Sequence, residues 1–194
     1  LIARRVREIG VYCEIHSYHL SNEEIRQFAP SGIILSGGPE SVIETQDVRA
    51  PESVFQLGCP VLGICYGMQT MAEQLGGKVS QGTNREFGYA EVTLEHPSAL
   101  LDGITDRSPN ILEVWMSHGD HVSVITPSFN IIASSPNCKI IGIANESKRF
   151  YGLQFHPEVS HTRQGMRILE KFILDICQCQ PNWTIKNIIE ESMT

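Results

Sequence analysis

The stretch VLGICYGMQ, residues 61–69, decides the fold of this chain. Its first four residues are apolar or small and predict a buried strand, which ends at a Gly-x-Cys-x-Gly turn. A helical pattern follows from about Tyr66 to Leu75. Glycines beside Cys65 allow the unusual backbone angles of a strand-to-helix elbow and leave the thiol accessible, as a nucleophile requires. The helix N-terminus also favours the reactive thiolate. The alternative is a buried cysteine beside an ordinary tight turn.

A histidine and a glutamate follow another apolar strand, YGLQFHPE at residues 151–158. Pro157 restricts His156 to an extended conformation, in which residues i and i+2 project to the same side. Glu158 is therefore placed to accept a hydrogen bond from one ring nitrogen of His156. The other nitrogen is then free to exchange a proton with a nucleophile. His-x-Glu alone is a weak signal, but together with the cysteine elbow it indicates a catalytic triad of Cys65, His156 and Glu158.

A third segment, IILSGGPES at residues 33–41, is an apolar strand that runs into a Gly-Gly-Pro turn. Glycines let backbone N–H groups approach a ligand closely, as an oxyanion hole requires. A phosphate-binding loop is disfavoured because neither Gly-x-x-x-x-Gly-Lys-Ser/Thr nor Gly-x-Gly-x-x-Gly occurs. A plain tight turn is the remaining alternative. From the residues alone, the chain is a cysteine hydrolase or acyl transferase.

The pattern of elements predicts an α/β fold, an open and mostly parallel sheet with helices on both faces. Helical patterns are expected at residues 2–9, 22–28 (capped by Ser21), 50–57 and 163–176, and strands at 11–15, 32–35 and 61–64. Later strand-like runs have little helix between them and predict a smaller mixed or antiparallel extension; they cover residues 89–94, 111–116, 130–134, 140–144 and 150–155.

These three segments, in this order, resemble the class I (triad-type) glutamine amidotransferases over nearly the whole chain. The resemblance implies their flavodoxin-like fold, with Cys65 as nucleophile, His156 as acid and base, and Glu158 as its orienter. It also implies an oxyanion hole made by the backbone N–H groups of Gly38 and Tyr66. The substrate glutamine is expected to contact Gln69 and the strand-to-loop segment that carries Ser117, His118, Gly119 and Asp120.

Within that family, the segments REFGYAEV (85–92) and WMSHGDHV (115–122) look most like the GMP synthetase branch. The resemblance implies that ammonia released from glutamine serves an ATP-dependent synthetase domain that converts XMP to GMP. No cofactor is expected in this domain, since ATP and magnesium belong to the synthetase. The amidotransferase domain is expected at residues 1–177, with a first strand missing upstream. Residues 178–194 are expected to be a linker and the start of a helix that leads to the synthetase domain.

Composition agrees with a single globular domain. A length of 194 residues allows one full core, and 41% hydrophobic with 19% charged residues is typical of soluble proteins. The net charge of −7 argues against a nucleic-acid partner, and no apolar run reaches the ~20 residues of a membrane helix. A thiol nucleophile favours a reducing compartment, so the cytoplasm is expected. No metal is expected at His118, Asp120 and His121, nor at Cys177 and Cys179, which lack a second ligand pair. A homodimer is one expected assembly of the full-length enzyme.

The residues leave three other functions open. The chain could serve another class I enzyme, in anthranilate, carbamoyl phosphate or CTP synthesis. It could be a stand-alone cysteine hydrolase that acts on γ-glutamyl compounds. It could also be a non-catalytic regulatory module on the same fold, although the intact triad argues against that reading.

Overall fold

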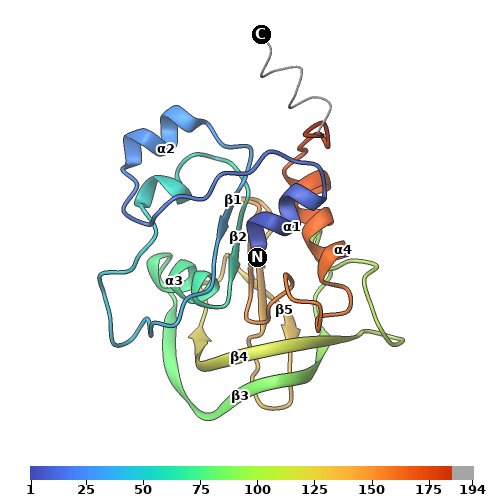
Figure 1. Ribbon diagram of the computed structural model, residues 1–194. Coiled ribbons are helices and arrows are strands. Elements are labelled where there is room, and N and C mark those ends of the chain that lie inside the picture. The colour runs from blue at the N-terminus through green and yellow to red at the C-terminus, as the bar shows by residue number, and fades with distance from the viewer. Residues whose placement is uncertain (185–194) are drawn as a thin grey trace.

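The computed structural model of the chain describes residues 1–184, apart from the side chains of residues 83 and 84. Figure 1 shows the arrangement of its helices and strands. In chain order they are α1 (Ile2–Glu8), α2 (Asn22–Phe28), β1 (Ile33–Leu35), the 3₁₀-helix η1 (Glu52–Phe55), β2 (Val61–Ile64), α3 (Tyr66–Gln74), β3 (Lys78–Leu94), β4 (Ile111–Val124), β5 (Asn130–Ser134), β6 (Gly142–Asn145), β7 (Phe150–Leu153), α4 (Gly165–Glu170) and the π-helix η2 (Lys171–Ile176).

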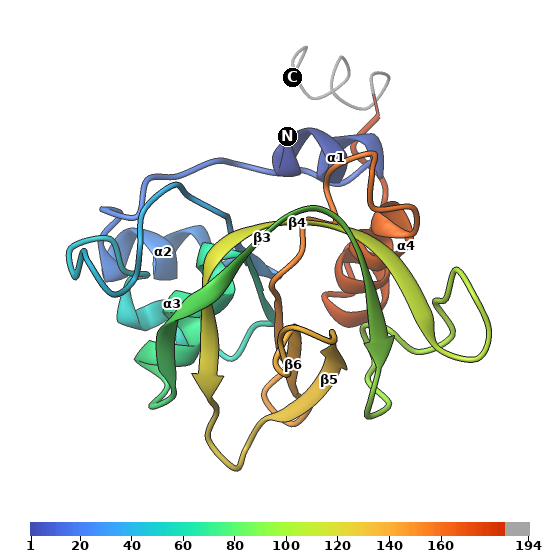
Figure 2. The same ribbon diagram turned by 90° about the horizontal axis from the view of Figure 1, so that it is seen from below.

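Within the described residues, the strands form a seven-stranded sheet in the order β1-β2-β7-β6-β5-β3-β4. Strands β1, β2 and β7 are parallel to one another. Strands β6, β5, β3 and β4 continue the sheet through antiparallel pairs. Figure 2 shows β3 and β4 as two long curved neighbours that run together across the molecule. The predicted α/β fold with an antiparallel extension is confirmed.

Helices cover both faces of the parallel strands, with α1 and α4 on one face and α2 and α3 on the other (Figure 1). Successive side chains of a strand point to opposite faces, and β2 shows this division. Its Leu62 and Ile64 belong to the same core as Phe172 of η2, whereas its Val61 belongs to the core that contains Met68 of α3. Both faces of β2 are therefore buried, which explains its uninterrupted apolar sequence.

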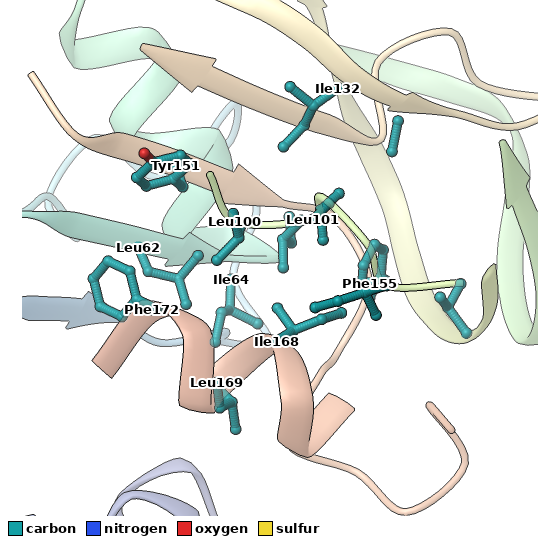
Figure 3. Packing of buried hydrophobic residues seen from close by; sticks show 14 of the residues in the cluster. Leu62, Ile64, Leu100, Leu101, Ile132, Tyr151, Phe155, Ile168, Leu169 and Phe172 are labelled. Atoms are coloured by element: carbon teal, nitrogen blue, oxygen red, sulfur yellow. The ribbon is translucent and has the colours of Figure 1, made fainter. Parts of the chain in front are cut away.

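Figure 3 shows the first of these cores from close by. Leu62 and Ile64 point toward the helix that carries Ile168, Leu169 and Phe172, and all five side chains are no more than 1% exposed. Burying such a side chain contributes roughly 1.5–3 kcal/mol relative to leaving it in water. This packing holds the C-terminal end of β2, where the cysteine lies, in a fixed position against α4.

The helix predicted at residues 22–28 is confirmed as α2, with the predicted cap at Ser21. The Ser21 hydroxyl accepts a hydrogen bond from the backbone N–H of Glu24 at 3.2 Å, and the Glu24 carboxylate accepts one from the Ser21 N–H at 2.9 Å. This reciprocal capping box satisfies two N–H groups that the helix itself leaves unpaired. The helix predicted at residues 2–9 is also confirmed, as α1.

The strand predicted at residues 11–15 is wrong. This segment has no strand pairing, and Tyr12 and Ile15 are 56% and 75% exposed. It runs beside the end of the described chain instead, where the Trp183 N–H donates to the Gly10 carbonyl at 2.8 Å. The Trp183 ring also meets the Tyr12 ring edge to face at 6.0 Å. An apolar pattern favours extended backbone, but only a neighbouring strand turns that backbone into part of a sheet.

Several predicted boundaries differ from the observed ones. Strands β3 and β4 extend through polar residues that the apolar pattern did not include, because each supplies the hydrogen-bonding partner of the other. The helix expected at 50–57 is reduced to η1, and the final helix changes from α4 to the wider turns of η2. The start of a helix expected within residues 178–194 falls mostly on residues 185–194, outside the described residues. Among residues 1–184, no helix is both long and apolar enough to cross a membrane.

Candidate active site

Cys65 lies in a sharp elbow between β2 and α3, with backbone angles φ 54° and ψ −111°. A positive φ is strained for a residue that carries a side chain, and such strain is found mainly at functional sites. Two glycines make the elbow possible. A Cβ on Gly67 would lie 2.0 Å from the Leu35 carbonyl oxygen, and one on Gly63 would lie 2.6 Å from the Gly67 backbone. The start of α3 therefore packs directly against the backbones of β1 and β2.

The Cys65 side chain is buried and contacts β4 and the residue that follows β7. Its sulfur lies 3.6 Å from the Ser117 carbonyl oxygen of β4, to which the thiol can donate. The side-chain amide nitrogen of Gln154, one residue beyond β7, lies 3.6 Å from the same sulfur. The backbone N–H of Cys65 donates to the Leu153 carbonyl at 2.7 Å, which extends the pairing of β2 and β7 into the elbow.

His156 follows β7 and is held by one hydrogen bond of its ring and two of its backbone. Nδ1 lies 2.8 Å from Oε1 of Glu158, as the extended His-Pro-Glu sequence predicts. The His156 backbone N–H donates to the Trp115 carbonyl at 3.1 Å, and its carbonyl accepts from the Thr162 hydroxyl at 2.6 Å. The two backbone hydrogen bonds fix the position of the residue, and the bond to Glu158 orients its ring.

The pKa of His156 rises to about 10, chiefly because of its hydrogen bond with the Cys65 sulfur and then because of the one with Glu158. Burial opposes this rise. The imidazole therefore carries a proton near neutral pH, and a positive charge beside a cysteine sulfur stabilises the thiolate. Cys65, His156 and Glu158 thus stand in the geometry of a nucleophile, a base and its orienter.

The Gly-Gly turn after β1 closes one side of this triad. A Cβ on Gly37 would lie 3.2 Å from Cε1 of His156 and 3.5 Å from the Cβ of Cys65, so the bare backbone passes directly over the site. Tyr66 is the first residue of α3, and its backbone N–H therefore has no partner within the helix. The Cβ position of Gly38 lies 4.0 Å from Cγ of Tyr66, so the two residues predicted to form the oxyanion hole are neighbours.

The segment predicted to hold the substrate lies inside β4, rather than at a junction of strand and loop as expected. Ser117 is exposed, whereas His118 is buried, with Nδ1 3.0 Å from the Asp120 carbonyl oxygen. The same carbonyl accepts from Nε2 of Gln69 at 2.9 Å. A Cβ on Gly119 would meet only the Arg85 side chain, at 3.7 Å. Gln69 therefore contacts the same segment of β4 whose Ser117 carbonyl contacts the Cys65 sulfur.

Sequence reasoning did not single out three residues that support the site. Gln154 contacts the Cys65 sulfur, Thr162 fixes the His156 backbone, and Nε of Arg5 donates to the Glu158 carbonyl at 2.9 Å. Gln154 offered one signal, because it is the single polar side chain in the apolar run YGLQF. Arg5 lies 153 positions from Glu158 in the chain, so no local pattern could connect them.

The sequence matches the family of class-I glutamine amidotransferases over residues 1–176, in agreement with this fold and site. The chain belongs to the class-I glutamine amidotransferases. Two curated relatives are the glutamine-hydrolyzing GMP synthases of Alcanivorax borkumensis, 59% identical over 196 residues, and of Methylococcus capsulatus, 60% identical over 198 residues. Each alignment covers 100% of this chain and 38% of the relative, so the chain spans well under half of their length.

Two solved structures are similar to this chain over most of its length. A putative GMP synthase subunit protein from Thermoplasma acidophilum superposes with a TM-score of 0.79 at 30% identity, over 98% of this chain and 89% of that one. A glutamine amidotransferase from Thermotoga maritima superposes with a TM-score of 0.53 at 25% identity, over 84% of this chain and 72% of that one.

Proposed function

We propose that this chain hydrolyses glutamine to glutamate and ammonia, and that the ammonia is used to convert XMP to GMP on an ATP-dependent synthetase domain. The single observation that supports the chemistry best is the hydrogen bond between Cys65, on its strained elbow, and the ring of His156, whose pKa it raises. Membership of the class-I amidotransferase family supports glutamine as the substrate. The printed names of the relatives support GMP as the product of the whole enzyme.

The proposed reaction begins when the Cys65 thiolate attacks the side-chain carboxamide carbon of glutamine. The backbone N–H groups of Gly38 and Tyr66 stabilise the oxyanion that forms, and one such donor is typically worth about 3 kcal/mol. His156 then protonates the leaving ammonia, which leaves a γ-glutamyl thioester on Cys65. Water, deprotonated by His156, attacks the thioester, and glutamate departs as the sulfur regains its negative charge.

Backbone groups of β4 are proposed to hold the amino-acid end of glutamine. The exposed position of Ser117, and the cover of Gly119 by the long side chain of Arg85 rather than by backbone, leave that backbone approachable. The His118 ring is turned inward, onto Asp120 and Glu86, so its contribution to substrate is proposed to be through its backbone. Gln69 has its amide nitrogen engaged inside the protein, which leaves its oxygen as the atom to meet substrate.

The partners, assembly, location and cofactor use of the chain are also proposals. Glutamine and a synthetase domain are the proposed partners, and the relatives' greater length supports a fused synthetase. A homodimer of the full-length enzyme, a cytoplasmic location, and a domain that uses neither a metal nor a cofactor all remain predictions.

The test is glutamate release from glutamine by this chain, alone and with the synthetase domain of a GMP synthase, XMP and ATP. We expect release to rise strongly with the partner and to vanish in Cys65→Ala. Cys13→Ala is the matched control, because Cys13 lies outside the site beside Glu14, and it should retain full activity. Strong release that ignores the partner would contradict the GMP assignment. Full activity in Cys65→Ala would contradict the nucleophile.

A further inference from the structure

Three amide and carbonyl groups form a continuous path from β4 to the Cys65 sulfur. Nε2 of Gln69, on α3, donates to the Asp120 carbonyl at 2.9 Å and to Oε1 of Gln154 at 3.1 Å. Nε2 of Gln154 then donates to the Cys65 sulfur at 3.6 Å. Gln154 is fully buried and Gln69 is 4% exposed, so water does not compete for these contacts.

The Asp120 carbonyl sets the direction of every donor in this path. A backbone carbonyl can only accept, so the Gln69 group that faces it must be the NH₂ group. The same NH₂ group faces Gln154, which must therefore present its oxygen to Gln69. The NH₂ group of Gln154 is left to face the sulfur. The alternative amide orientations would place oxygen against oxygen at Asp120, at a distance where only a donor is favourable.

We propose that Gln154 is a catalytic residue that donates a hydrogen bond to the Cys65 sulfur and stabilises its thiolate, with Gln69 as the positioning residue that keeps the donor pointed there. This inference rests on the proposed function, in which Cys65 is the nucleophile. A thiolate accepts hydrogen bonds, and a donor at a fixed, dry position favours the charged form. Gln154 thereby stabilises the same thiolate as His156 does. Its amide donates this hydrogen bond without gaining or losing a proton.

This path of hydrogen bonds also connects β4, the strand proposed to bind substrate, to the nucleophile Cys65. The Asp120 carbonyl belongs to β4, and the thiol can donate to the Ser117 carbonyl of the same strand. A shift of β4 would therefore alter both the donor and the acceptor that the sulfur meets.

The test is the pH dependence of Cys65 alkylation by iodoacetamide, followed by mass spectrometry of the peptide that contains Cys65. Gln154→Met has a similar volume and no donor, while Gln154→Glu has the same shape and places a carboxylate beside the sulfur. Gln74→Met is the matched control, because it removes the same amide group from a glutamine of α3 that bonds to Ala50, away from the cysteine. Circular dichroism shows whether each variant folds.

These substitutions leave the surrounding titratable and charged groups in place. Those groups come from the segment after β7, from β4 and β3, and from the loop after β1; they are His156, Glu158, His118, Asp120, Glu86 and Glu40.

We expect the pH midpoint of alkylation to rise by about one unit in Gln154→Met, which lowers the rate about tenfold below the midpoint, and to rise further in Gln154→Glu. The control should titrate as the wild type does. Gln69→Glu should shift the midpoint in the same direction, because its carboxylate would accept from Gln154 and turn the Gln154 oxygen toward the sulfur.

Folded Gln154 variants with the wild-type profile would overturn the inference. A wild-type Cys65 that reacts no faster at neutral pH than the other cysteines would instead contradict the proposed function, so the two failures are distinguishable. If neither Gln154 variant folds, the side-chain ¹⁵N–H₂ signal of Gln154 in the wild type supplies the test. It should shift when Cys65 is alkylated, and an unmoved signal would overturn the inference.

Discussion

Nε2 of His118 lies 3.2 Å from Oε2 of Glu86 across the β3–β4 ladder, and their side chains are only 5% and 12% exposed. Neither atom makes a hydrogen bond of good geometry. Nδ1 of His118 faces the Asp120 carbonyl and must carry a proton to donate to it. In the neutral ring, Nε2 therefore presents a lone pair to a carboxylate oxygen. Burial lowers the pKa of His118 and so favours the neutral ring at neutral pH. The lone pair of Nε2 then faces the Glu86 carboxylate, which is a repulsive contact.

Glu86→Gln should therefore stabilise the fold at pH 8. The amide can donate to the lone pair on Nε2, and a gain of about 1 kcal/mol is expected in urea unfolding. A lowered pKa gives His118 a stabilising effect that is complete above its ordinary value of 6.5 and declines as the pH falls below it. Because the Glu86 carboxylate raises the pKa of His118, Glu86→Gln should lower that pKa further. The variant should therefore lose more stability than the wild type as the pH falls below 6.5. A variant less stable than wild type at pH 8 would contradict this account of the pair.

The proton on His156 should depend on the Cys65 sulfur. That contact is the largest cause of the rise of the His156 pKa to about 10, so Cys65→Ala should lower the pKa markedly, with Glu158 still in place. Since the folded pKa lies above the ordinary 6.5, the proton stabilises the fold fully below pH 6.5, and this effect is lost as the pH rises toward 10. Histidine NMR titration measures the change. An unchanged His156 titration in Cys65→Ala would show that the sulfur is not its partner.

Glu158→Ala should reduce glutamine hydrolysis less than His156→Ala does. The first change removes the carboxylate that orients the ring, whereas the second removes the base itself. Backbone hydrogen bonds from Thr162 and to Trp115 continue to hold His156 in Glu158→Ala, which should preserve part of the activity. Steady-state kcat for glutamate release compares the two. Equal losses would indicate that the ring and carboxylate act as one inseparable unit.

Gly67→Ala should destabilise the chain by about 3 kcal/mol, because its Cβ would lie 2.0 Å from the Leu35 carbonyl oxygen. Backbone on both sides of this contact cannot move independently. Gly119→Ala is the matched control: its Cβ would meet only Arg85 at 3.7 Å, so stability should change by less than about 1 kcal/mol. Urea unfolding measures both. Equal effects would mean that α3 can move away from β1 without cost.

Local patterns predicted most of the elements near the site. The elbow at Cys65, the strand β2 and the capped helix α2 need only neighbours in sequence, and all three are as predicted. The failures among the strands share one cause. Residues 11–15 have the pattern of a strand but no partner, while β3 and β4 are longer than their apolar runs because each pairs with the other. Strand pairing is a property of two segments, and one segment cannot show it.

The sequence by itself determined the strand-to-helix elbow and the hydrogen bond between His156 and Glu158. Pro157 keeps His156 extended, and side chains two residues apart in an extended segment project to the same side. Only the tertiary structure decided which carbonyl orients Gln69, and thus which atom of Gln154 meets the Cys65 sulfur. The participants come from α3, β4 and the end of β7, as many as 89 positions apart. Hydrogen-bond direction between such segments depends on their three-dimensional packing, which no local pattern records.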